Sequence, residues 1–173
     1  MVACCIVMPF NEKTWLLLYY NALILHIFKV VHVMNTKIFK AVHNLAEQLM
    51  DAANRNDRKR FELLFSRLKA ICEENEHTSK DHPVQWETLA DFTEELEEAI
   101  TMYEKALQKS VAINNNDHMS SIAYSMATLQ IELGKKDEAI NNLKSAKISA
   151  NKIEDKALKA EIHELLESLI AEG

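Results

Sequence analysis

Glycine and proline are almost absent from this sequence, which has two of each among 173 residues. A β-sandwich, a barrel or a doubly wound α/β fold needs these residues where its backbone turns. Their scarcity, beside abundant Ala, Leu, Glu and Lys, favours helices joined by short polar turns. Gly134 and Gly173 are the only glycines, so the sequence has no glycine-rich phosphate-binding loop. We therefore predict an all-α fold.

Apolar residues recur at helical spacing from residue 36 onward, and polar stretches interrupt them near residues 54–57, 73–82, 114–117 and 134–136. Short polar residues and glycine at these interruptions match the signals of helix ends. We expect N-caps at Asp57, Asp81 and Asp117, a capping box at Asp91 and Glu94, and a left-handed helix stop at Gly134. A last helix should begin near Glu154. Trp86, Phe92 and Tyr103 are expected in the core.

Two of the expected helix hairpins share a small-residue pattern. The later one carries Met126, Ala127, Gly134, Ala139, Ile140, Leu143 and Ala146. The earlier one carries Ala99, Ile100, Tyr103, Ala106 and Leu107 in its second helix. These strings resemble the tetratricopeptide repeat, whose usual period is 34 residues. The aligned positions Phe61, Ala99 and Ala139 are 38 and 40 residues apart, and Phe61 fills a small-residue position of the family. The resemblance covers residues 35–171 and is specific over about 94–147.

The resemblance implies antiparallel helix-hairpin repeats, a TPR-like α-solenoid with a C-terminal capping helix. Family members bind peptides or helices in a concave groove and have no chemistry of their own. On the family's geometry, the groove-facing positions would be Ser121, Tyr124, Thr128 and Ile131. An exposed Tyr and Ile there would make an anchor pair, unless the C-terminal helix covers them. The implied function is a non-catalytic adaptor or scaffold for a protein or peptide partner. The alternative is a structural homo-oligomer whose groove binds a second copy.

Other polar clusters have simpler explanations than chemistry. The carboxylates of residues 94–98 fit a solvated helix start, and the cations of residues 55–60 fit local salt bridges. The seven histidines lack metal-ligand spacing, so we predict no metal, no cofactor and no catalytic residues. Residues 81–173 hold eighteen acidic against nine basic side chains, which argues against a nucleic-acid partner. Cys72 should be unreactive beside Glu73 and Glu74.

Residues 1–33 differ from the domain expected at 34–173. They hold one acidic and two basic residues, and the stretch 14–33 is mostly apolar. Its length suits a membrane anchor, although a central lysine there costs about 2–3 kcal/mol. Two other interpretations stay open: an over-extended start before Met34, or a helix that packs on the domain. Three cysteines offer no disulfide framework, so we expect a cytoplasmic protein, or a membrane-anchored one if the segment is an anchor.

We predict that residues 1–33 are dispensable for folding, because a hairpin array buries its own apolar stripes. Chains beginning at Met1 and at Met34 should both melt cooperatively when followed by circular dichroism. Aggregation of the shorter chain beside a soluble longer one would show that the segment belongs to the core. Partition of the longer chain into membranes in cells would favour the anchor.

Overall fold

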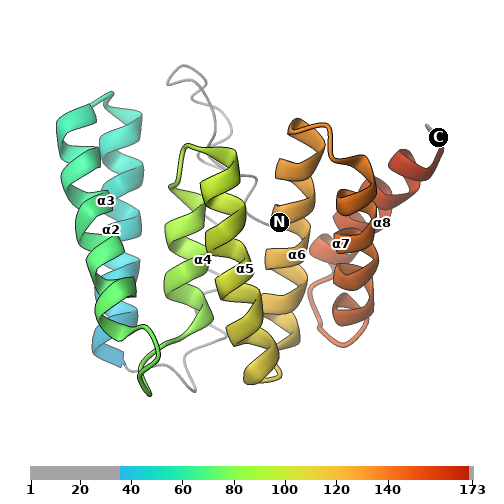
Figure 1. Ribbon diagram of the computed structural model, residues 1–173, viewed down its shortest axis with the longest axis horizontal. Coiled ribbons are helices and arrows are strands. Elements are labelled where there is room, and N and C mark those ends of the chain that lie inside the picture. The colour runs from blue at the N-terminus through green and yellow to red at the C-terminus, as the bar shows by residue number, and fades with distance from the viewer. Residues whose placement is uncertain (1–35, 172–173) are drawn as a thin grey trace.

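The computed structural model describes residues 36–171, which form seven helices and no strands. Figure 1 shows them side by side in one row, from α2 at one end to α8 at the other. The helices are α2 (Thr36–Asn54), α3 (Arg58–Asn75), α4 (Pro83–Asp91), α5 (Leu96–Ala112), α6 (Asn116–Glu132), α7 (Lys136–Ala150) and α8 (Lys156–Ala171). The prediction of an all-α fold is confirmed for this part of the chain.

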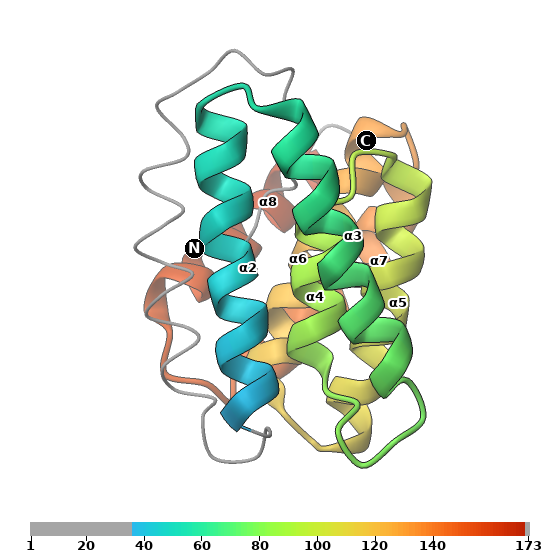
Figure 2. The ribbon, with the colours of Figure 1, turned by 90° about the vertical axis from the view of Figure 1, so that its left-hand side faces the viewer.

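The helices pack in the order in which they occur in the sequence. Each contacts the next one, and α2, α4, α6 and α8 also touch one another in succession. Turned by 90°, the row shows two layers, with α2, α4, α6 and α8 on one side and α3, α5 and α7 on the other (Figure 2). Short turns within the pairs α2–α3, α4–α5 and α6–α7 reverse the chain, so each pair is an antiparallel hairpin.

Four of the connections between helices use a residue in the left-handed region, where the backbone turns most tightly, and one of these residues is His77 between α3 and α4, with a φ of 62°. Gly134 has a φ of 71°, as the sequence predicted, and it lets the chain leave α6 and enter α7. Asn56 and Asn114 take the same role with φ angles of 54° and 51°. Asparagine tolerates this conformation better than most other residues. Two asparagines therefore replace the glycines that this chain lacks.

One predicted N-cap is confirmed and two are wrong. Asp57 accepts a hydrogen bond from the Arg60 backbone at 3.1 Å and caps α3. At α6 the cap is Asn115, and Asp117 lies inside the first turn. The run of short polar residues before α6 offers several possible capping acceptors. The N-cap is the residue with an extended backbone conformation, which is Asn115. At α4 the cap is His82, one residue after the predicted Asp81.

The predicted capping box at Asp91 and Glu94 is also wrong. Asp91 is the last residue of α4, and its side chain is buried. Helix α5 begins later, and its N-cap, Glu95, makes no side-chain capping hydrogen bond. The spacing of Asp91 and Glu94 fits a capping box, but Asp91 is buried in the core, where it binds Tyr103.

The core consists of two apolar clusters on opposite sides of α6. The first joins α2, α3, α4 and α5 to Ile122, Met126 and Leu129 of α6. The second joins Ala123 and Ala127 of α6 to α7 and α8. Helix α6 is therefore buried on two faces, which is the position of an interior element in a row. Trp86, Phe92 and Tyr103 all lie in the first cluster, as predicted.

Fully buried alanines lie on α5 and α7, the second helices of the two hairpins with the most extensive helix–helix contact. Ala99 and Ala106 of α5 and Ala139 and Ala146 of α7 are each 0% exposed. Only a small side chain lets two helix backbones come close without forcing their axes apart. The burial predicted for Ala99 and Ala139 is confirmed.

None of the helices in the described range is long and apolar enough to span a bilayer. The predicted extension at residues 1–33, with its possible anchor at residues 14–33, lies outside the described residues.

We predict that Ala139→Glu lowers the free energy of unfolding by at least about 3 kcal/mol, because it overpacks the α6–α7 contact and buries a charge. Thermal or urea unfolding measures the change. The matched control is Ala160→Glu on α8, where the alanine is exposed and the same substitution should cost less than about 0.5 kcal/mol. Equal stability of the two variants would reject the close helix contact.

Candidate functional site

The four predicted groove residues lie on one stripe of α6, because their positions repeat at helical spacing. Ser121 is 2% exposed, whereas Tyr124, Thr128 and Ile131 are half-buried. Tyr124 and Ile131 pack against the second core cluster, which α6, α7 and α8 form together. Part of each side chain is thus held by the core and part reaches solvent. The outer part of the stripe is therefore covered only in part.

Ser121 belongs to a polar seam between α4 and α6. Its hydroxyl donates to Glu87 Oε1 at 2.6 Å. The other carboxylate oxygen, Oε2, lies 2.8 Å from Nδ1 of His118. Both oxygens of one α4 carboxylate therefore contact α6, which fixes the register of the two helices. Glu87 and its α6 partners are more than 30 residues apart in the chain, and no local pattern predicted their meeting.

His82 extends this seam at the start of α4. Its Nδ1 accepts from the Val84 backbone at 3.3 Å, and its ring meets that of His118 edge to face, with centroids 5.7 Å apart. Nε2 of His82 is buried without a hydrogen-bond partner. Burial, followed by the neighbouring His118, lowers the pKa of His82 to about 4, although Glu87 and Asp81 oppose the shift. His82 is therefore neutral at physiological pH.

A second buried carboxylate joins α4 to α5. Asp91 accepts a hydrogen bond from the Tyr103 hydroxyl at 2.5 Å, and both residues are almost fully buried. Burial, and next the charge of Glu87, raises the pKa of Asp91 well above its usual value. Tyr103 matches the aromatic of the tetratricopeptide string, and its hydroxyl binds a residue that the sequence had placed in a cap. Because both side chains are buried and bind each other, we assign the pair a structural role.

The loop between α3 and α4 is held on α5 by Asp81. This carboxylate accepts from Lys109 Nζ at 2.6 Å, from Trp86 Nε1 at 2.8 Å and from the His77 backbone at 2.8 Å. Burial by itself raises the pKa of Asp81, but these donors outweigh it and the net pKa is lowered. Lys105 lies over the Trp86 ring, 4.2 Å from its centroid. The predicted cap residue thus anchors the loop instead.

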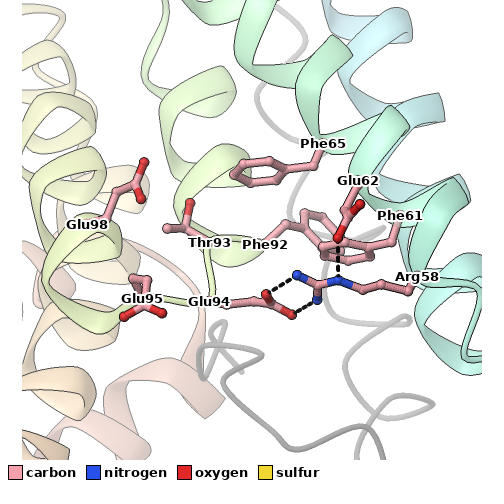
Figure 3. A pocket seen from close by; sticks show the side chains of 9 residues that line it. All are labelled: Arg58, Phe61, Glu62, Phe65, Phe92, Thr93, Glu94, Glu95 and Glu98. Carbon is pink, nitrogen blue, oxygen red and sulfur yellow. Dashed lines mark hydrogen bonds and ion pairs between the residues drawn. The ribbon is translucent and has the colours of Figure 1, made fainter.

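The basic cluster of residues 55–60 forms the salt bridges that the sequence predicted. Arg55 and Arg60 both bind Asp51, at 2.8 and 3.0 Å. Arg58 binds Glu62 on its own helix at 2.8 Å, and its guanidinium also makes a two-pronged contact with Glu94 (Figure 3). The hydrogen bonds between Arg58 and Glu94 raise the arginine pKa and lower the carboxylate pKa.

This long-range ion pair borders a small pocket between α3 and the turn from α4 to α5. The pocket has a volume of about 160 Å³. Phenylalanine rings and a rim of carboxylates surround it, and the lining residues are Arg58, Phe61, Glu62, Phe65, Phe92, Thr93, Glu94, Glu95 and Glu98 (Figure 3). The sequence placed Glu94, Glu95 and Glu98 at a solvated helix start, but gave no sign that α3 would face them.

Residues 36–171 contain no cluster of three or more His, Cys, Asp or Glu that could hold a metal ion. Cys72 is buried, and burial raises its pKa to about 12, with Asp81 and Glu73 adding to the shift. Its thiol therefore stays protonated and makes a poor nucleophile.

Comparisons of this chain with protein-family models, with curated proteins and with solved structures found no match. The tetratricopeptide resemblance thus rests on the motif residues themselves.

We predict that His82 makes the fold acid-sensitive. The folded-state pKa of His82, about 4, lies below the unfolded value of 6.5. The contribution of His82 to the free energy of unfolding is therefore complete above pH 6.5 and is lost as the pH falls toward 4. The loss should reach about 2 kcal/mol at pH 5. His82→Asn keeps a capping acceptor and removes the titrating group. Urea unfolding at pH 7 and pH 5 should show a smaller pH effect in the variant. Equal losses in both proteins would reject this assignment.

Proposed function

We propose that this protein is a non-catalytic, TPR-like helical-repeat adaptor that binds a protein or peptide partner through the α6 stripe. The observation that carries the proposal is the open row of hairpins, in which α2, α4, α6 and α8 share one layer and contact one another in succession. Such a row offers a continuous face of first helices. Helical-repeat proteins use faces of this kind for extended partners.

The α6 stripe has the properties of a binding anchor. Tyr124 and Ile131 are fixed on one side by the second core cluster and are partly exposed on the other. A side chain that is already immobilised loses little further entropy when a partner packs on it. Tyrosine is also among the residues that contribute most to protein interfaces. Thr128 lies between these two and can add a hydrogen bond.

The polar seam supports the proposal by positioning the stripe. The bonds from Glu87 to Ser121 and His118 tie α6 to α4 and hold the stripe at a fixed rotation relative to α4. Ser121 itself is 2% exposed and its hydroxyl binds Glu87, so its role is to orient the helix rather than to touch a partner.

We predict that Tyr124→Ala weakens partner binding by about 1–2 kcal/mol, as expected for a partly buried aromatic anchor, without loss of helicity. Proteins captured from cells by the full-length chain are quantified by mass spectrometry. At least one should be retained by the native chain and reduced about fivefold or more by Tyr124→Ala. Circular dichroism confirms that the variant is folded.

The matched control is Ile148→Ala on α7, which removes an apolar side chain that is 65% exposed and lies outside the stripe. Capture should not change in this control. If capture of partner proteins falls equally in both variants, or falls in neither, the α6 stripe is not the binding face. Light scattering after size exclusion tests the rival, because a dimer that Tyr124→Ala dissociates would make the stripe an interface between copies of this chain.

A further inference from the structure

The pocket in Figure 3 lies away from the α6 stripe and combines an apolar floor with a charged rim. Its floor consists of the rings of Phe61, Phe65 and Phe92, of which Phe65 is half-buried. Its volume of about 160 Å³ resembles that of an engineered cavity of about 150 Å³ that binds benzene. The space therefore fits one side chain of moderate size, and the aromatic floor suits its apolar part.

The rim of the pocket is strongly acidic. Four carboxylates, from Glu62, Glu94, Glu95 and Glu98, and one guanidinium, from Arg58, line the pocket. Glu62 and Glu94 bind Arg58, and Glu98 lies 3.6 Å from Lys69. Glu95 is exposed, and its side chain makes no capping hydrogen bond. Because negative charge exceeds positive charge here, the complementary occupant is a cation.

Arg58 shows which cation this environment accommodates. Its guanidinium binds both oxygens of the Glu94 carboxylate and lies over the Phe61 ring, 5.8 Å from the centroid. A guanidinium is planar and weakly hydrated, so it can contact a ring face and a carboxylate together. An ammonium group keeps its water more firmly and cannot bind a carboxylate through two parallel hydrogen bonds.

We propose that this pocket binds an arginine side chain of a partner protein. The aliphatic stem lies on Phe65 and Phe92, and the guanidinium binds Glu95 and Glu98, which are neighbours on the first turn of α5. The positive end of the α5 dipole opposes a cation, but it amounts to about half a charge and four carboxylates surround the site. The pocket and the α6 stripe share no residue, so the proposal for the pocket can be wrong while the proposal for the stripe is right, and the reverse.

The test is a titration of the full-length chain with N-acetyl-arginine methylamide, followed by amide chemical shifts. Saturable shifts should appear at residues 58–65 and 92–98. The citrulline analogue, which has the same shape without the charge, should bind at least about tenfold more weakly, and the lysine analogue should bind more weakly than arginine. Absence of saturable shifts at these residues, or equal affinity for citrulline or lysine, would overturn the proposal.

Removal of the acceptor charges tests the geometry. Glu95→Gln with Glu98→Gln should weaken arginine binding about fivefold, because two exposed ion pairs are lost. The matched control is Glu104→Gln, an exposed carboxylate farther along α5, which should leave affinity unchanged. Unchanged affinity in the double variant, or an equal loss in the control, would refute the assigned acceptors. If the double variant fails to fold, the comparison of arginine with citrulline decides alone.

Discussion

Close contact between helices, made possible by buried alanines, is the constraint on which the rest of this structure depends. Ala99, Ala106, Ala139 and Ala146 occupy the positions where α5 and α7 meet their neighbours, and none of them is exposed. Each hairpin is too thin to bury its apolar stripe alone, so neighbouring hairpins must supply the other side of the core. Helix α6 shows the result most clearly, because one core cluster lies on each side of it.

Buried polar pairs then decide how the closely packed helices are aligned. The apolar contacts alone would tolerate small slides of one helix along another. The Glu87 carboxylate of α4 binds both Ser121 and His118 of α6. These contacts oppose sliding of α4 along α6, because a slide would leave buried polar atoms without partners. The Asp91–Tyr103 pair does the same between α4 and α5. These bonds place the α6 stripe and the Arg58 pocket at fixed positions in the row.

Local sequence signals predicted the elements well, and long-range polar contacts poorly. Helical periodicity, Gly134 and the small residues at Ala99 and Ala139 act within a few turns of chain, so the sequence displays them directly. The roles of the carboxylates are harder to predict from the sequence, because an Asp can cap a helix, anchor a loop or pair with a buried tyrosine. Which role it takes depends on residues that are distant in sequence. The ion pair from Arg58 to Glu94 spans 36 positions, and no local pattern encodes it.

The measurement that tests this account most directly is a methyl nuclear Overhauser experiment on the full-length chain with labelled Ile, Leu and Val. An open row predicts cross-peaks between α6 and both of its neighbours in the same layer, α4 and α8. It predicts none between Leu49 of α2 and Leu166 of α8, which lie in helices at opposite ends of the row (Figure 1). A cross-peak between these two leucines within one molecule would mean a closed bundle, and it would contradict the open face on which the proposed binding depends.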